Sequence, residues 1–396
     1  MSTLTVDLIR DAVAGNAAAF RTRNRLQPAE GEGSKVFPPT YAEGTYALEN
    51  RRVKQPDGSI ATIPCVLIDS VQSQANRHEE ALQNAIDAGQ ISLPLVVVDF
   101  SGEQLPDAVG TVTSLTAPHR IADAILRDSE INGVRFRQTD IGRSLDAASL
   151  QNATPLYELC PTALIFGIWD STGPRGGLGA KFQRAFVSEI VGINAVTGVK
   201  TSSRIDPLQI RAAAKIIKEA DGNYTLAENE KSKGAVSPSE INHGNIRPDV
   251  DDKTGGVTLD YAEQTAVLSL AALRRLHFPV NGDRSEERDI AGRTVLATIA
   301  LASAALAYET GFDLRSRCLL WPERVSEWEL LATPGEVPQK FRLAAAEALE
   351  GVEEAVAAAE ALGLVWRSEP LVLTPSTSLV TLLRRSQEIA ATTPKE

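Results

Sequence analysis

Residues 60–100 have the sequence IATIPCVLIDSVQSQANRHEEALQNAIDAGQISLPLVVVDF, which sets out a strand, a helix and a second strand. Ile60–Ile68 is rich in β-branched side chains and favours a strand. Asp69 and Ser70 follow as a helix cap, and apolar residues then recur at spacings of three and four, as on one face of a helix. Leu93–Phe100 is almost wholly apolar, which predicts a central, buried strand. This order predicts a sheet with a helix packed against it.

The other apolar segments divide between strand and helix signals. Strands are predicted at Thr162–Trp169 and Pro370–Leu373, whereas Phe186–Ile193 fits a strand or the end of a helix. Helices are predicted in the first 20 residues, from Pro118 to about Ser129, after the Asp206-Pro207 cap, in Tyr261–Gly311, in the alanine-rich stretch Pro338–Gly363, and near the C-terminus.

Strands separated by helices early, with a helical mass late, indicate an α+β fold. The order suits an RRM-like (ferredoxin-like) core sheet with large insertions and a helical C-terminal part, and it suits a doubly wound sheet equally well. We expect residues 1–260 to form the core and residues 261–396 a mainly helical part packed on it. Residues 221–260 are polar and rich in Gly, Asn, Lys and Ser, which predicts a projecting loop or hairpin.

Charge is unevenly distributed along the chain. The net charge of −11 and the pI of about 5.1 count against nucleic-acid binding, which usually requires a basic surface. However, Ser171–Lys218 contains eight basic and two acidic residues, a balance of +6, whereas Trp321–Leu362 contains three basic and nine acidic residues, a balance of −6. We therefore expect any contact with a polyanion in the basic middle of the chain.

Cysteine usage and hydropathy indicate the compartment. Cys65, Cys160 and Cys318 stand far apart, which favours a reducing compartment over a disulfide framework or a zinc ribbon. The N-terminal residues lack the basic and apolar regions of a signal peptide. The apolar stretch Thr294–Tyr308 is shorter than the roughly 20 residues that a membrane-spanning helix needs. We expect a cytoplasmic protein with no membrane partner.

A glycine-rich turn, Gly173–Gly179, has the composition of a phosphate-binding loop without its pattern. In a P-loop, Lys and Ser or Thr follow the last glycine directly, and the dinucleotide template would need glycine where Phe182 stands. Small residues still let the backbone approach a polyanion, and Arg175, Lys181 and Arg184 supply positive charge. We predict nucleic-acid contacts here; the alternative is a turn needed only for strand geometry.

Three further segments carry amides and cations suited to phosphates, sugars and splayed bases. Their candidates for RNA binding are Gln72, Gln74, Asn76, Arg77, His119, Arg120, Arg143, Arg204, His243 and Asn245. Arg211, Lys215 and Lys218 would also share one face of the helix predicted after Asp206, although a solvated face is the commoner explanation of that spacing. Helix capping and surface ion pairs remain open as alternatives for the other candidates.

Catalytic patterns are sparse. The four histidines form no metal-binding motif with Cys or Glu, and no GxSxG elbow occurs. Asp69, Asp99, Asp140 and Asp170 lie near predicted strand ends or turns, where metal-dependent nucleases place carboxylates, but no spacing selects a pair. We expect no enzyme activity, no cofactor and no metal. A metal-dependent ribonuclease and a small-molecule enzyme that uses the glycine turn stay open as alternatives.

The long motifs together resemble one family, the backbone RAMP-superfamily protein of type I-U, or I-G, CRISPR systems. They are CVLIDSVQSQANR (Cys65–Arg77), LTAPHRIADAILRDSEINGVRFRQTDIGR (Leu115–Arg143), LYELCPTALIFGIWDSTGPRGGLGAKFQRAFVSEIVG (Leu156–Gly192), TSSRIDP (Thr201–Pro207) and SPSEINHGNIRP (Ser237–Pro248).

The resemblance implies an RRM-like RNA-binding core and copies that polymerise along a guide RNA (crRNA) in the Cascade effector complex, with a projecting hairpin that divides the guide. The implied partners are the guide, the target DNA strand that pairs with it, other copies of the chain and other Cascade subunits. The related backbone protein of type III systems cuts RNA with an aspartate, which keeps the ribonuclease alternative in view.

Overall fold

The computed structural model describes residues 2–54, 57–170, 181–219, 222–229 and 231–392. Helix and strand contents are similar, at about 33% and 31%, so the α+β class is confirmed. The main sheet has ten strands in the order β1-β25-β24-β2-β21-β13-β6-β5, with β23 also paired to β2 and β22 to β23. They are β1 Ser2–Thr3, β2 Ala19–Pro28, β5 Leu48–Lys54, β6 Ile60–Asp69, β13 Phe186–Ile193, β21 Tyr261–Ser269, β22 Phe312–Arg315, β23 Cys318–Pro322, β24 Glu327–Leu331 and β25 Gln339–Arg342.

Four strands at the centre follow the order β24-β2-β21-β13, and neighbouring strands are antiparallel. Helix α2 (Val71–Asp87) lies in the chain between β2 and β13, and α8 (Glu286–Glu309) lies between β21 and β24. These elements follow the β-α-β-β-α-β sequence that the ferredoxin-like prediction requires. Large insertions separate them, since the hairpin of β5 and β6 precedes α2 and a second sheet follows it.

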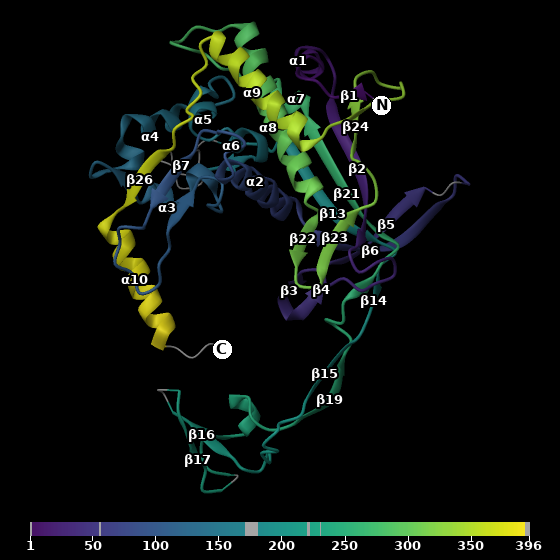
Figure 1. Ribbon diagram of the computed structural model, residues 1–396, viewed down its shortest axis with the longest axis vertical. Coiled ribbons are helices and arrows are strands. Elements are labelled where there is room, and N and C mark those ends of the chain that lie inside the picture. The colour runs from purple at the N-terminus through teal and green to yellow at the C-terminus, as the bar shows by residue number, and fades with distance from the viewer. Residues whose placement is uncertain (1, 55–56, 171–180, 220–221, 230, 393–396) are drawn as a thin grey trace.

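Helices cover one face of the main sheet in two layers (Figure 1). Helix α8 packs against α2, β21 and α1 (Val6–Ala14), and α9 (Ala345–Ala361) packs on α8. Helix α8 is long and apolar enough to span a membrane, but 89% of its most apolar 18-residue window is buried in the protein. A helix that is apolar on all sides is expected in such a position, between a sheet and a second layer of helices.

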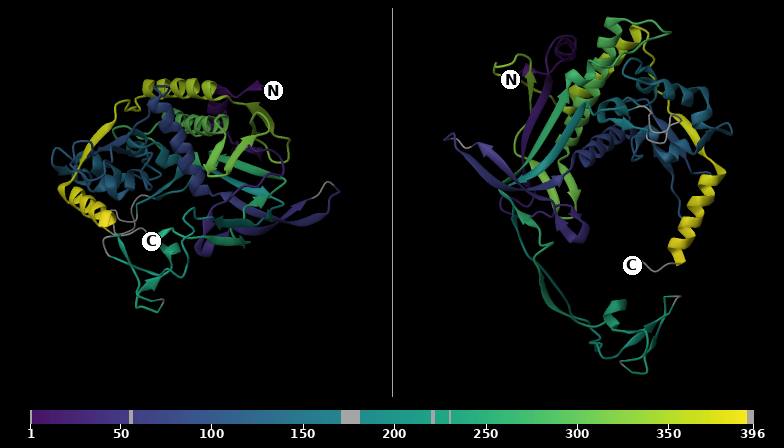
Figure 2. Two further views of the ribbon diagram at one scale, coloured as in Figure 1. Left: turned by 60° about the horizontal axis from the view of Figure 1, so that its bottom comes forward. Right: turned by 180° about the vertical axis from the view of Figure 1, so that it is seen from behind.

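A second sheet forms a separate lobe and joins distant parts of the chain (Figure 2). Its order is β10-β9-β26-β7-β8, with β7 at Val96–Asp99, β8 at Thr111–Thr113, β9 at Ser129–Ile131, β10 at Val134–Arg135 and β26 at Leu371–Pro375. Strand β26 pairs in parallel with β7, placing Leu371 beside Val96. The C-terminal helix α10 (Thr377–Thr392) follows β26. The lobe is therefore completed by the C-terminal part of the chain.

A long ribbon projects from the edge of the core (Figure 1). Its base pairs β14 (Val196–Thr197) with β20 (Val257–Thr258), and its stem pairs β15 (Lys200–Arg204) with β19 (Ile246–Asp251). Its tip is a small sheet of β16 (Ile216–Lys218), β17 (Tyr224–Leu226) and β18 (Ala235–Val236). The projection expected at 221–260 therefore exists, but it begins near Val196.

The strand β6, the helix α2 capped by Ser70, the strands β7 and β26 and the helix α10 confirm the corresponding predictions. Four others are wrong in whole or in part. Thr162–Trp169 forms the helix α6 (Thr162–Phe166) and the two-residue strand β11 (Ile168–Trp169), because an apolar run alone does not separate a buried strand from a buried helix. The region Tyr261–Gly311 opens with the strand β21, so the main sheet continues past residue 260.

The third wrong prediction is the helix after Asp206. The Asp206 carboxylate does accept hydrogen bonds from the backbone N–H of Leu208 and Ile210, but also from that of Gly244, and Gln209 has a φ of 48°. The cap therefore closes a turn, and Lys218 lies in β16. Arg211, Lys215 and Lys218 consequently share no helix face. The helix predicted from Pro118 is also broken, into one 3₁₀ turn (Arg120–Ala122) and α3 (Ala124–Arg127).

Candidate nucleic-acid interface

An exposed tryptophan marks the strongest candidate site. Strand β11 pairs with β12 (Lys181–Phe182), and Trp169 lies directly opposite Lys181 in this hairpin. The Trp169 side chain is 61% exposed, and the Lys181 ammonium lies 5.4 Å from the centroid of the indole ring. A cation at this distance is attracted by the π-face of the ring. An indole that packs against no core leaves its flat face open to a ligand.

A buried ion pair holds this hairpin at Gly167. Arg120 Nη1 donates to the Gly167 carbonyl at 3.1 Å, while Nε and Nη2 of Arg120 each donate to a Glu79 oxygen at 2.7 Å. Both side chains are buried, and burial raises the pKa of Glu79 to about 7 against the opposing effect of the Arg120 charge. Arg120 itself has a φ of 53°, a conformation that costs energy for a bulky residue. Direct contact of Arg120 with RNA is therefore not supported, because its buried guanidinium already makes three hydrogen bonds within the protein.

A second arginine holds the other end of β11. Arg137 Nη2 donates to Asp170 at 2.8 Å and to Asp146 at 2.6 Å, and all three side chains are at least three-quarters buried. Gly167 is itself constrained, since its φ is 84° and a Cβ there would lie 3.0 Å from Arg184 Cγ. Trp169 is thus fixed from both sides before any ligand arrives.

Unpaired cations surround the hairpin. Arg184 is exposed and forms no ion pair with any described residue, and the same holds for Arg275, just after α7 (Leu270–Leu273). A hollow of about 210 Å³ lies between these segments, with Lys181, Gln183 and Arg275 at its polar rim and apolar residues below. His119 is also exposed, one residue before the arginine that holds Gly167. The predicted residues Lys181 and Arg184 are therefore both exposed at this hairpin, and His119 is exposed next to the arginine that holds it.

The candidates on α2 separate into two groups. Gln72 and Asn76 are exposed, four residues apart on the helix. Gln74 is fully buried, where its amide donates to Asp69 at 2.7 Å and its carbonyl oxygen accepts from Ser188 at 2.9 Å. Gln74 belongs to a buried polar network and cannot reach RNA, so that prediction is wrong.

Arg77 is mainly a structural residue as well. Its guanidinium pairs with the buried Asp69 at 2.9 Å and donates to the Leu314 carbonyl at 2.8 Å, so it ties α2 to β22. Arg315 approaches the same carboxylate at 3.7 Å. Three-quarters of the Arg77 side chain is buried, which leaves little of its charge for a phosphate.

The candidates in the ribbon form the joint between its stem and its tip. Arg204 donates to the carbonyls of His243 and Gly244, at 2.9 and 3.0 Å, and Asn245 Oδ1 accepts from the Asp206 N–H at 2.7 Å. The motifs around Arg204 and His243 are thus paired with each other, and the side chains of Arg204 and Asn245 are occupied by backbone partners.

Two further candidates lie outside the ribbon. Arg143, on α4 (Asp140–Ser144), is exposed and donates hydrogen bonds to Asp140 and to the Gln138 carbonyl. Arg175 and the glycine-rich turn lie outside the described residues.

The open face of the main sheet differs from an RNA-binding sheet, which presents aromatic rings to bases. Arg21, Arg23 and Arg25 do project from alternate positions of β2 on this face. However, Arg21 pairs with Glu329 on β24, Arg23 binds both oxygens of Glu263 on β21 at 2.8 Å, and Arg25 lies over Tyr261. These cross-strand contacts engage all three arginines, although only Arg21 and Arg23 are paired with acids. Unpaired cations beside an exposed aromatic ring occur instead around Trp169.

The candidate carboxylates for metal catalysis do not converge. No three His, Cys, Asp or Glu side chains of the described chain are grouped to hold a metal ion. Asp69 is buried between Arg77 and Arg315, Asp170 is paired with Arg137, and Asp140 stands exposed on α4 beside Arg143.

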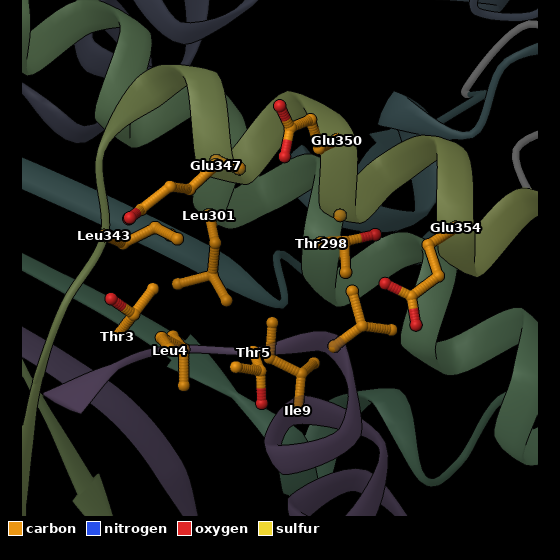
Figure 3. Close-up of a pocket in the computed structure, with 13 residues that line it drawn as sticks. Thr3, Leu4, Thr5, Ile9, Thr298, Leu301, Leu343, Glu347, Glu350 and Glu354 are labelled. Atoms are coloured by element: carbon orange, nitrogen blue, oxygen red, sulfur yellow. The ribbon is translucent and has the colours of Figure 1, made fainter.

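A pocket of about 220 Å³ lies between α1, α8 and α9 (Figure 3). Leu4, Ile9 and Leu301 are among its apolar lining residues, and Glu347, Glu350 and Glu354 of α9 lie along one side. Its lining contains no His, Cys, Lys or Arg, so its ionisable residues are the three glutamates.

Two residues of the site were missed from the sequence. Trp169 could have been found, because an aromatic residue precedes the glycine-rich turn and a lysine follows it. Arg275 gave no signal, because its contribution depends on α7 packing beside β12.

Comparison with known proteins links this part of the chain to CRISPR-associated proteins. Residues 20–197 match the family described as CRISPR-associated protein GSU0053 (Cas_GSU0053). The match runs from β2 to β14, so it includes α2 and the Trp169 hairpin and ends at the base of the ribbon. The chain is similar to that family over this range. No curated protein matches the chain.

Proposed function

We propose that the chain binds single-stranded guide RNA as the repeated backbone subunit of the type I-U, or I-G, CRISPR effector complex, Cascade, within the RAMP superfamily. The family match supports a role in CRISPR defence. The observation that carries the RNA-binding proposal is the set of exposed, unpaired cations and one exposed indole around β11 and β12. Such groups bind phosphates and bases without reading sequence, which in this proposal is left to pairing of the guide with target DNA.

The ribbon supports the polymerisation part of the proposal. It carries exposed apolar side chains at Ile205, Leu208, Leu226 and Val250, which are 62–85% exposed. Exposed apolar residues on a projection whose described residues belong to neither apolar core cluster favour a contact with another molecule. We propose that this other molecule is the next copy of the chain on the guide, with further Cascade subunits at the ends of the row.

The acidic net charge is compatible with this function. A subunit with one basic site and an acidic remainder binds RNA at that site and repels nucleic acid elsewhere. In the same proposal the protein is cytoplasmic, binds no membrane and is not an enzyme.

The test is a salt series with several unrelated guide RNAs. We expect similar affinities for all sequences and a steep fall in affinity with salt, because neutralised phosphates release counterions. Replacing both Lys181 and Arg184 by Gln should weaken binding and reduce the slope of log K against log salt by about 1.4, that is about 0.7 for each lost contact with a single strand. The matched control replaces Arg10 and Arg385 by Gln, since each is exposed and paired only within its own helix.

A flat salt response, or strong preference for one guide sequence, would contradict the proposal. So would equal losses of affinity in the double variant and in its control, because the charge around β12 would then be no better a binding site than any other.

A further inference from the structure

An exposed indole on a strand that is anchored at both ends, beside free cations, calls for a ligand with a flat face and a negative charge. The chain has four tryptophans, and Trp328 is buried in the core. Trp321 is also exposed, but an acidic residue, Glu323, follows it two positions later in the sequence. No described cation lies over the Trp321 ring. Trp169 alone among the described tryptophans has a cation over its ring. Trp169 therefore differs from the other described tryptophans in being exposed with a cation at its ring.

The hairpin is preorganised to present this ring. Two salt-bridged arginines hold its ends, Arg120 at Gly167 and Arg137 at Asp170. Arg120 is in turn held by two hydrogen bonds to Glu79 on α2. A flat side chain on such a support loses little conformational freedom on binding, which is what a recognition platform requires.

The surroundings fit a nucleotide better than a peptide. Lys181 reaches both the Trp169 ring and the rim of the 210 Å³ hollow, where Gln183 and Arg275 add an amide and a second cation. A base stacked on the Trp169 ring would place its sugar and phosphate near Lys181 and Arg275. The side-chain amide of Gln183 offers both a donor and an acceptor to a sugar hydroxyl. No acidic residue lines the hollow to receive a basic peptide side chain.

We propose that Trp169 is a stacking platform for one unpaired base of the bound RNA, with Lys181 and Arg275 as contacts for the adjoining phosphates. This inference rests on the proposed RNA binding and specifies its geometry. Stacking tolerates any base, because every base has a π-face. Each copy of the chain would therefore hold one nucleotide of the guide on its Trp169 ring, whatever the guide sequence.

The test compares Trp169→Ala, Trp169→Leu and Trp169→Phe on a short single-stranded RNA that binds one copy of the chain. Trp169→Ala should weaken binding roughly 5- to 150-fold, the fold-change that corresponds to ~1–3 kcal/mol of base–aromatic stacking. Trp169→Leu should be nearly as weak, since it keeps apolar bulk without a π-face, and Trp169→Phe should recover most of the affinity. The slope of log K against log salt should stay as in the wild type, because no charge is removed. Trp321→Ala is the matched control and should bind normally.

A second readout reports stacking directly. RNA with one 2-aminopurine at each position in turn should show quenched fluorescence at one position with the wild type and not with Trp169→Leu. Wild-type affinity for Trp169→Ala, alongside salt-dependent binding by both proteins, would overturn the platform and leave the RNA proposal intact. Failure of the wild type to bind RNA at all would overturn the proposed function instead. Normal binding of one copy but fewer copies on a long guide would assign Trp169 to a contact between subunits and would also overturn the platform.

Discussion

At the scale of single residues, Arg120 shows how a motif arginine can act on the site from inside the fold. Its charge is matched by Glu79 and its Nη1 donates to the Gly167 carbonyl, so its removal would leave the buried Glu79 carboxylate without its ion-pair partner. Removing one member of a buried ion pair costs far more than removing both.

We predict that Arg120→Gln lowers the free energy of unfolding by about 3–5 kcal/mol at pH 8, where Glu79 of the wild type is ionised. The double variant Glu79→Gln/Arg120→Gln should recover most of this loss, because two amides can hydrogen-bond without a buried charge. Urea unfolding of the wild type, the two single variants Glu79→Gln and Arg120→Gln, and the double variant measures both effects. The control, Arg143→Gln, removes an exposed arginine and should change the free energy by less than about 1 kcal/mol. Full stability of Arg120→Gln with loss of RNA affinity would return Arg120 to the list of RNA contacts.

His78 of α2 gives the fold a specific sensitivity to acid. The ring is buried between Phe166 and Phe186, its Nδ1 lies 3.3 Å from the Ser303 carbonyl, and its Nε2 has no hydrogen-bond partner among the described residues. Burial lowers the pKa of His78 to about 4, against the smaller opposing effects of the Ser303 carbonyl and Asp69. The folded protein therefore keeps the ring neutral, while the unfolded chain takes up a proton below about pH 6.5.

Proton uptake by the unfolded state means that this residue destabilises the fold as the pH falls from about 6.5 to about 4. We predict that His78→Phe removes this part of the pH dependence, so that the difference in free energy of unfolding between variant and wild type changes by about 3 kcal/mol from pH 7 to pH 4. Denaturant unfolding at a series of pH values measures it, and His119→Phe, at an exposed histidine, is the control. Parallel curves for His78→Phe and wild type would contradict the assignment.

At the scale of elements, the ribbon is separable from the core. No described residue between 196 and 256 belongs to either apolar core cluster. Within the ribbon, Arg204 lies opposite Ile246 in the stem register, so the stem can be closed there without its tip. A two-residue Asn-Gly turn matches the twist of such a hairpin.

We predict that replacing residues 205–245 by Asn-Gly leaves the free energy of unfolding within about 1 kcal/mol of the wild type, because the tip buries little of the apolar surface. The same change should reduce the number of copies bound to a long guide RNA, measured by mass or by electron microscopy. The control replaces residues 334–337, an exposed turn between β24 and β25, by Gly and Ser. Rows of equal length with both variants would show that the contacts between copies lie outside the tip.

At the scale of the whole molecule, the ribonuclease alternative depends on whether carboxylates converge. The described carboxylates are paired, buried or isolated, and none forms a group that could bind a metal ion. Exposed cations without an ion pair among the described residues occur around the β11–β12 hairpin, at Lys181, Arg184 and Arg275, and also along the ribbon.

We predict that the purified protein leaves labelled RNA and DNA intact in Mg²⁺ or Mn²⁺, as judged by gel electrophoresis. Asp140→Ala and Asp99→Ala serve as comparisons, because these two of the four candidate carboxylates are the ones with solvent access. Cleavage by the wild type that either substitution abolishes would establish the ribonuclease alternative.

The sequence by itself determined the elements whose signals are local. The strand β6, the Ser70 cap and the amphipathic α2 follow from neighbouring residues, as do the apolar α8 and the strand and helix at the C-terminus. Nucleic-acid contacts near Lys181 and Arg184 were predicted from composition, and both side chains are exposed. A local pattern suffices in these cases because backbone preference and the spacing of apolar side chains act over a few residues.

Only the tertiary structure decided which polar side chains are exposed and unpaired, and so available to bind a ligand. Arg120 and Arg184 have the same side chain, yet one finds Glu79 in the interior and the other finds no described acid. The same holds for Arg275, which lines one hollow with Lys181 although the two are far apart in the sequence. Pairing and burial depend on partners far away along the chain, and no local pattern encodes where those partners lie.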